Sequence, residues 1–217
     1  PEEALAATEE AVGHWRRLAA RRPDAHTPDL ARSLGNLGNR LSALGRPEEA
    51  LAATEEAVGH WRRLAARRPD AHTPDLAGSL TNLGNWLSAL GRPEEALAAT
   101  EEAVGHWRTL AARRPDAHTH TPDLARSLGV RSMILAVLDR PAEAATSAAE
   151  GLRLLLPYLV ARLPETHGKL AQALGSLYLA AISAAGLDID HDLMGDLGRA
   201  IDPDMAAGAK AVGLSDD

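Results

Sequence analysis

The chain has 217 residues, a formal net charge of −7 and no cysteine. The absence of cysteine excludes disulfides and thiolate metal sites, and the negative charge argues against a general nucleic-acid-binding protein. No apolar run approaches the roughly 20 residues that a membrane-spanning helix needs. Alanine, leucine, arginine and glutamate dominate, and these residues favour helices over strands. We therefore expect a cytoplasmic, all-helical protein without a membrane segment.

A unit of 46 residues is repeated along the chain. Residues 1–46 and 47–92 agree at all but three positions. The three differences are Arg32 to Gly78, Gly35 to Thr81 and Arg40 to Trp86. A third copy begins at Pro93 and diverges after Leu128. A fixed period of this length predicts stacked structural repeats, in which each unit packs only on its neighbours.

The first part of each unit has the pattern of an amphipathic helix. In the first copy it runs from Pro1 to about Arg21, with Pro and Glu at its start and Arg at its end. These placements suit a helix N-terminus and C-terminus, respectively. Its apolar residues recur at spacings of three, four and seven, which predicts one buried stripe. Pro23 is predicted to end this helix.

The second part of each unit predicts another helix. Thr27 is a suitable N-cap, Pro28 a suitable first residue, and Asp29 a suitable first-turn anion. Leucines then follow on one face, and Gly45 is placed to end the helix in a left-handed conformation. Neither helix can bury its apolar stripe alone, so we expect the two to pack as an antiparallel pair.

Several residues fall at the spacing of the tetratricopeptide repeat signature. They are Leu34, Leu37, Gly38, Leu41, Gly45, Ala50 and Ala57, and, one unit later, Leu80, Leu83, Gly84, Leu87, Gly91, Ala96 and Ala103. The chain resembles the long-helix subtype found in kinesin light chains, whose asparagine–leucine pair is matched by Asn36-Leu37. This resemblance implies an all-α fold, a right-handed solenoid of antiparallel helix pairs with a C-terminal helical cap.

The C-terminal part of the chain departs from the repeat. The resemblance covers residues 1–163, and we assign residues 164–217 to a helical capping region. In the third unit, apolar residues replace polar ones, which predicts a covered face; the replacements are Val130, Met133, Ile134 and Val137. Further helices are expected over about Pro141 to Val160 and Glu165 to Ala184. Two short candidates follow, His191–Ile201 and Pro203–Val212.

The three differences between the first two units all fall on the second helix of the unit. The resemblance implies that its side away from the leucines lines an inner, concave groove. Surface drift is one explanation, and we prefer a tuned surface that binds a protein or peptide. Asparagines would hold a ligand backbone there, because an amide both donates and accepts hydrogen bonds. The predicted groove residues are Arg32, Gly35, Asn36, Asn39, Arg40, Gly78, Thr81, Asn82, Asn85, Trp86 and Arg126.

Three other patterns invite a chemical interpretation. The repeated His-Trp pair, as at His14-Trp15, predicts a core tryptophan beside a solvated histidine. His118 and His120 lie in a loop without a third metal ligand, and repeat slippage explains them. In the Asp188–Asp192 cluster, Asp190 is a suitable helix cap. We predict no catalytic residue, metal site or cofactor.

Taken together, these features predict a non-catalytic protein-interaction module. Two alternatives remain: the sensor arm of a larger signalling protein, such as a bacterial NTPase, or a metal-dependent enzyme that uses His118, His120 or the Asp188–Asp192 cluster. Because the sequence starts within a repeat, we interpret it as a fragment of a longer protein. The first helix then lacks its preceding partner, so we expect self-association through its open face.

Overall fold

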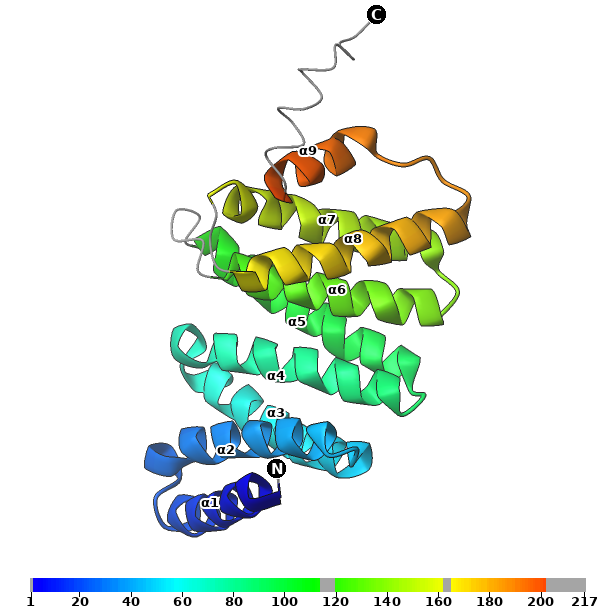
Figure 1. Cartoon of the computed structure of the whole chain (residues 1–217). Coiled ribbons are helices and arrows are strands. Elements are labelled where there is room, and N and C mark those ends of the chain that lie inside the picture. Colours follow the sequence, from blue (N-terminus) through cyan, green and yellow to red (C-terminus); the bar gives the residue numbers. More distant parts are fainter. Residues whose placement is uncertain (1, 114–119, 162–164, 202–217) are drawn as a thin grey trace, which may run out of the picture. The chain divides into compact units, whose positions relative to one another are not determined.

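The computed structural model describes residues 2–113, 120–161 and 165–201, and within these ranges it is helical without any strand (Figure 1). The helices fall into two compact units, Pro1–Arg113 and Arg114–Asp217. Most consecutive helices within each unit pack against each other. The predicted fold class, an all-α solenoid of antiparallel helix pairs, is confirmed.

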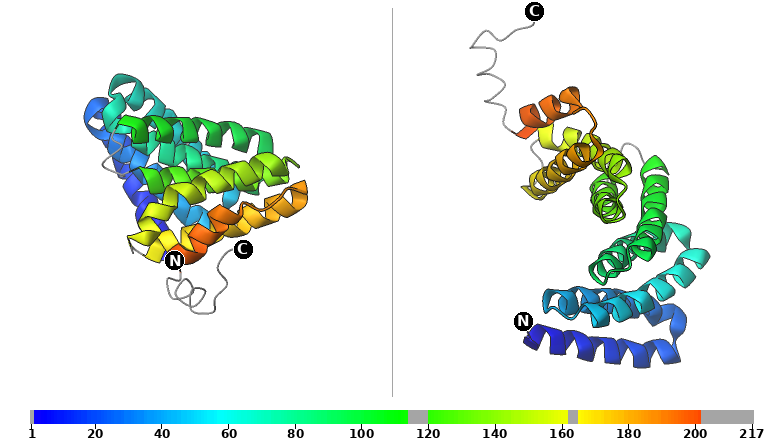
Figure 2. Two further views of the ribbon diagram at one scale, coloured as in Figure 1. Left: turned by 90° about the horizontal axis from the view of Figure 1, so that it is seen from above. Right: turned by 90° about the vertical axis from the view of Figure 1, so that its right-hand side faces the viewer.

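The first unit contains five helices among its described residues, and they follow one another in chain order in the right view of Figure 2. They are α1 (Glu2–Arg21), α2 (Pro23–Ala43), α3 (Pro47–Arg67), α4 (Pro69–Ala89) and α5 (Pro93–Arg113). Each packs chiefly on the next helix, and α2 also touches α4. The helices α1, α3 and α5 form one series, which we call B helices. We call α2 and α4 A helices. From here on, one repeat is an A helix with the B helix that follows it, as in α2–α3 and α4–α5.

Among its described residues, the second unit begins with an A helix and ends with a short helix. Its members are α6 (Thr121–Val137), α7 (Pro141–Val160), α8 (Glu165–Ala185) and α9 (His191–Ile201). The last three agree with the predicted helices to within one residue. The predicted Pro203–Val212 helix lies outside the described residues. Since α7 packs as extensively on α8 as on α6, packing shows no break near residue 163. The division into array and cap therefore remains a prediction.

The helices α2 and α4 begin five residues earlier than predicted, at Pro23 and Pro69 in place of Pro28 and its equivalent Pro74. Proline suits the first helical position, because its missing N–H would have no acceptor there. The extra turn also carries His26, whose ring lies 5.9 Å from that of Trp15 on α1. Pro28 is consequently inside the helix. The prediction failed because two starts were available, and the ring contact favours the earlier one.

The A helices end as predicted. Gly45 and Gly91 have φ angles of +70° and +71°, in the left-handed region that glycine adopts without steric cost. In the third repeat, Asp139 occupies the corresponding position with φ of +56°. Aspartate is among the residues that tolerate this conformation.

Within each repeat of the first unit, a glycine of the A helix lies against a threonine of the following B helix. A β-carbon on Gly38 would lie 2.5 Å from Thr54 Oγ1 and 3.2 Å from the Ala50 carbonyl oxygen. Gly84 is placed in the same way against Thr100. Both threonines are buried, with 2% and 0% of their surface exposed. Only glycine therefore allows the two helices to approach this closely.

In the third repeat, the larger of the two contacting side chains lies on the A helix and the smaller one lies on the B helix. Thr100 Oγ1 donates to the carbonyl of Ala96 at 2.7 Å, within its own helix. The equivalent carbonyl, that of Ala144 on α7, accepts from Ser132 Oγ on α6 at 2.8 Å. Ser132 stands in the glycine position, and the fully buried Ala148 stands in the threonine position. The hydroxyl has moved from the B helix to the A helix while the same carbonyl keeps a donor.

This exchange predicts a compensating pair of substitutions. Gly84→Ser alone should lower the unfolding free energy by about 1–3 kcal/mol, because the new hydroxyl overlaps Thr100. Adding Thr100→Ala should recover most of that loss, as the Ser132 and Ala148 pair does. Urea denaturation of the single and double variants measures this coupling.

Gly105→Ser on α5 is the matched control, since a β-carbon there meets nothing within 4 Å. It should leave stability unchanged within about 0.5 kcal/mol. Additive losses in the double variant would show that the glycine and threonine positions do not contact each other as described.

Candidate functional site

The helices α2 and α4 each carry two asparagines three residues apart, and we call these four residues the asparagine face: Asn36, Asn39, Asn82 and Asn85. Asn82 Nδ2 donates to Asn39 Oδ1 at 3.3 Å across the two A helices. The two asparagines of α2 are exposed, and those of α4 are half-buried. The structure thus brings together predicted groove residues from successive repeats, and their amides can hydrogen-bond a peptide backbone.

A depression of about 500 Å³ adjoins the asparagine face between α1 and α2. Its lining comprises Ala7, Thr8 and Ala11 of α1 with Ser33, Asn36, Asn39, Arg40 and Ala43 of α2. The α1 side is apolar apart from the threonine, whereas the α2 side is polar and carries the Arg40 cation. This combination suits a ligand with both apolar and hydrogen-bonding groups.

Two of the predicted arginines form local ion pairs. Arg32 Nη1 lies 3.2 Å from Asp29 Oδ1 one turn earlier, and about 60% of the Arg32 side chain is exposed. Arg126 makes the same pairing with Asp123 in the second unit. Because these pairs are exposed, each contributes little to stability. Their guanidinium groups can therefore change partners to bind a carboxylate at small cost.

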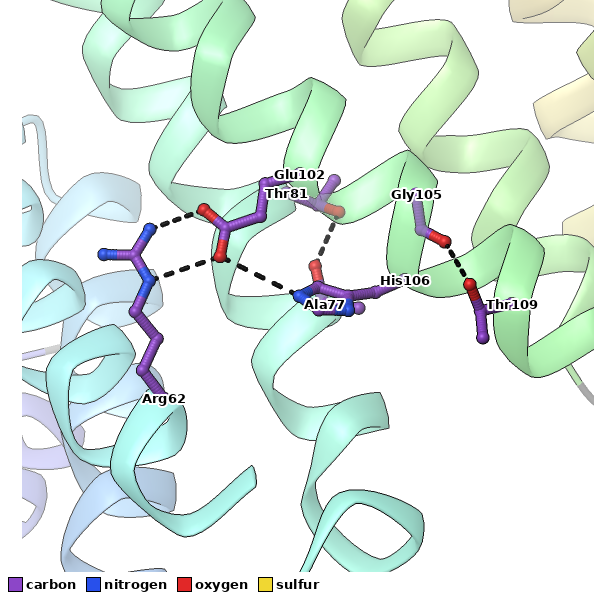
Figure 3. Close-up of polar contacts among 7 residues, drawn as sticks. All are labelled: Arg62, Ala77, Thr81, Glu102, Gly105, His106 and Thr109. Atoms are coloured by element: carbon purple, nitrogen blue, oxygen red, sulfur yellow. Dashed lines mark hydrogen bonds and ion pairs between the residues drawn. The ribbon is translucent and has the colours of Figure 1, made fainter. Parts of the chain in front are cut away.

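The three positions that differ between the first two repeats do not form one exposed surface, contrary to the prediction. Thr81 is only 3% exposed, and its Oγ1 donates to the Ala77 carbonyl at 3.0 Å (Figure 3). Its side chain is consequently turned away from any groove ligand. A β-carbon on Gly78 would lie 4.0 Å from the Trp107 ring, whereas one on Gly35 would meet nothing within 4 Å.

Trp86 is packed against the preceding repeat. Its Nε1 donates to Thr54 Oγ1 at 3.1 Å, and its ring lies against an apolar cluster formed by Leu5, Leu41, Ala50 and Ala53. Trp86 is therefore a half-buried ring packed on its neighbours and not a fully exposed groove residue. Arg40, its counterpart, is exposed.

The apolar replacements in the third repeat are only partly covered. Val130 and Ile134 are 6% and 1% exposed, as the sequence predicts for a covered face. Met133 and Val137 are 43% and 66% exposed. Positions one turn apart on the same helix thus differ, and the prediction of a covered face holds for the first pair alone.

The tryptophans of the repeated His-Trp pairs lie between helices. Trp61 and Trp107 are 2% and 4% exposed, which agrees with the prediction of core residues. The neighbouring His60 is half-buried instead of solvated, and this burial lowers its pKa. Its Nδ1 lies 2.9 Å from Arg63 Nη2.

Sequence reasoning missed the contacts that join successive B helices. Arg16 pairs with Glu56 at 2.5 Å, and one repeat later Arg62 pairs with Glu102 at 2.5 Å. Figure 3 shows the second pair, with His106 on the other side of Glu102. The signal was present, since any Arg and Glu that face each other once must do so again after 46 residues. Exposed pairs of this kind contribute roughly 0–1 kcal/mol each.

A second depression, of about 400 Å³, lies between α3, α4 and α5. Its lining includes Leu76, Leu110 and Thr109. Thr109 on α5 is equivalent to Arg63 on α3. The α5 position therefore carries a short hydroxyl, whereas the α3 position carries a long cation. No sequence motif marked this site, because the difference is a single residue in a repeat that is otherwise retained.

The aspartates near α9 act as structural groups. Asp190 Oδ1 accepts from the Leu193 N–H at 2.9 Å, and Asp190 Oδ2 binds Arg153 at 2.6 Å. The backbone hydrogen bond and the arginine lower the pKa of Asp190. Asp190 is therefore a helix N-cap, as predicted.

The described parts of the chain contain no group of three His, Asp or Glu side chains that could hold a metal ion. His120 immediately precedes α6 without capping it through its side chain. His118 lies outside the described residues. Among the described helices, none is both long and apolar enough to cross a membrane.

Comparisons with known proteins identify the repeats. Residues 30–67 and 76–110 match a family model described as tetratricopeptide repeat. No curated protein matches the chain. BtubC (BKLC) from P. vanneervenii has a similar crystal structure, with 17% identity and a TM-score of 0.53, covering 100% of this chain and 94% of that chain.

A second similar structure is that of a putative kinesin light chain from Podospora anserina with nearly identical TPR-like repeats. It has 18% identity and a TM-score of 0.57, covering 96% of this chain and 90% of that chain. At this identity, both structures show the fold alone. The two matched segments coincide with the pairs α2–α3 and α4–α5. The chain therefore contains tetratricopeptide repeats in these two segments.

Proposed function

We propose that the chain is a non-catalytic protein-interaction module that binds an extended peptide segment on the asparagine face. The hydrogen bond between Asn39 and Asn82 is the observation that carries this proposal. It places amides from two successive repeats side by side on one surface. Tetratricopeptide repeats serve as protein-interaction scaffolds, which supports the same function.

The spacing of the amides suits a backbone better than a side chain. An extended peptide presents a donor or an acceptor every few ångströms, and each asparagine can offer both partners. The depression next to Asn36 and Arg40 would accept a side chain with an apolar stem and an acidic or amide end. Arg32 would add a second cation after leaving Asp29. The ligand chemistry is therefore an acidic or polar extended segment.

The sensor-arm alternative uses the same surface within a longer protein. A nucleotide-binding domain upstream of residue 1 in the full-length chain would identify that arrangement. Self-association through the open face of α1 stays a separate prediction.

The asparagine face can be tested without a known ligand. A phage library of random 12-residue peptides would be selected on the immobilised 217-residue chain. Selected peptides should bind a variant with all four asparagines changed to alanine at least about tenfold more weakly, since each lost bond contributes roughly 0.5–1.5 kcal/mol. Fluorescence anisotropy measures the two affinities.

Gln172→Ala is the matched control, because it removes an exposed amide from α8. Binding to this variant should be unchanged. Peptides that bind the four-alanine variant as tightly as the wild type would refute the asparagine face as the binding surface.

Trp86→Arg separates packing from binding. We expect this variant to lose about 1–3 kcal/mol of unfolding free energy, because the half-buried ring leaves Leu41 and Ala53 and its bond to Thr54 is lost. Thermal unfolding followed by circular dichroism measures the loss. The control Arg40→Ala, at the equivalent exposed position, should change stability by less than about 0.5 kcal/mol. Unchanged stability in Trp86→Arg, together with weaker peptide binding, would instead make Trp86 a binding anchor.

A further inference from the structure

The depression between α3, α4 and α5 has a counterpart one period earlier in the chain, between α1, α2 and α3. Eleven residues line the depression, and ten of them have an identical residue 46 positions earlier. The exception is Thr109, whose equivalent is Arg63. The two places therefore show the effect of one side chain within otherwise the same lining. We call the depression between α3, α4 and α5 the Thr109 site.

The two side chains leave different amounts of room beside the neighbouring histidine. At the earlier place, Arg63 Nη2 lies 2.9 Å from His60 Nδ1, so the long side chain is held against the ring. At the Thr109 site, the short Thr109 side chain turns back to its own helix, where its Oγ1 donates to the Gly105 carbonyl at 2.9 Å (Figure 3). The space beside His106 that an arginine would take is therefore part of the depression of about 400 Å³.

One side of the Thr109 site is apolar. Leu76 of α4, Leu110 of α5 and Ala65 of α3 line it, and they are 3%, 7% and 8% exposed. These side chains offer apolar surface to a ligand body that would leave water on binding. The volume of the site falls within the range of about 300–1,000 Å³ that is usual for small-molecule sites. The dimensions thus suit a small molecule.

The charged residues that line the site are two arginines and one glutamate. Arg62 is already paired with Glu102 at 2.5 Å, and Glu102 lies 3.8 Å from His106 Nε2 on its other side (Figure 3). Arg113 is paired at 2.5 Å with Asp70, whose side chain is 91% exposed. Such an exposed pair contributes little to stability. Arg113 can therefore exchange Asp70 for the carboxylate of a ligand.

We propose that the Thr109 site binds a small amphipathic carboxylate. The apolar chain of the ligand lies against Leu76 and Leu110, and Arg113 binds its carboxylate. The excess of positive charge in the lining disfavours an amine with the same chain. Binding here is a function separate from peptide binding, because no residue of the asparagine face lines the Thr109 site.

The test uses octanoate as the probe and the 217-residue chain labelled with ¹³C and ¹⁵N. The histidine ring signals are followed by NMR and assigned through single His→Gln variants. Octanoate should shift the His106 signal in a saturable way and leave the His60 signal in place. Octylammonium, which has the same chain and the opposite charge, should bind at least about tenfold more weakly. Arg113→Gln should weaken octanoate binding to a similar extent, because it removes the cation that binds the carboxylate.

Exchanging the two differing side chains tests the site in both directions. Thr109→Arg should abolish the octanoate shift of His106 without unfolding the chain, because the earlier place already carries this arginine. Arg63→Thr should create a second site, so that octanoate also shifts the His60 signal. The matched control is Thr146→Arg on α7, where an exposed threonine makes the same hydrogen bond to the carbonyl four residues earlier. This control should bind octanoate as the wild type does.

Three results would overturn the proposal. The first is the absence of a saturable His106 shift with octanoate in the wild type. The second is octylammonium binding as tightly as octanoate, which would exclude a carboxylate site. The third is an unchanged His106 shift in Thr109→Arg together with no His60 shift in Arg63→Thr, which would place the probe elsewhere. Loss of peptide binding in the four-alanine variant would not affect any of these readouts, so the two proposals can fail separately.

Discussion

The contact between a glycine on the A helix and a threonine on the B helix sets the geometry of each repeat in the first unit. Gly38 and Gly84 permit an approach that any β-carbon would prevent. Helices that pack this closely bring their leucines and alanines into contact, and that apolar burial supplies most of the stability. The exchange to Ser132 and Ala148 shows that the fixed quantity is the summed volume at the crossing, together with a donor for one carbonyl. The identity of either residue alone is not fixed.

The same threonine also joins one repeat to the next. Thr54 lies against Gly38 of its own repeat, and its hydroxyl accepts a hydrogen bond from Trp86 of the following one. Position 86 is therefore tied to stacking, whereas the equivalent Arg40 is exposed and lines the depression between α1 and α2.

The sequence predicted the fold well because the period of 46 residues repeats every local signal. Helix ends at Gly45 and Gly91, core tryptophans at 61 and 107, and the Asp190 cap all follow from local rules. The start of α2 was wrong, because both Pro23 and Thr27 are suitable first-turn residues and the choice depends on a ring contact with another helix. The burial of Thr81 and the packing of Trp86 could not be predicted for the same reason. The neighbouring repeats decide which side of an A helix is exposed. Helical spacing within one helix does not show how those neighbours pack.

Fewer of the predicted groove residues are exposed than the sequence suggested, and asparagines are the residues that both repeats share. The four asparagines occur identically in both repeats, and the structure joins two of them across the repeat boundary. A row of equal amides cannot distinguish one side chain from another, so it would supply affinity for a backbone rather than selectivity. Selectivity would have to come from the positions that vary beside it, and of these Arg32 and Arg40 are exposed while Thr81 and Trp86 are committed to packing. If the asparagine face binds a peptide as proposed, the two exposed arginines beside it would select acidic segments over neutral ones.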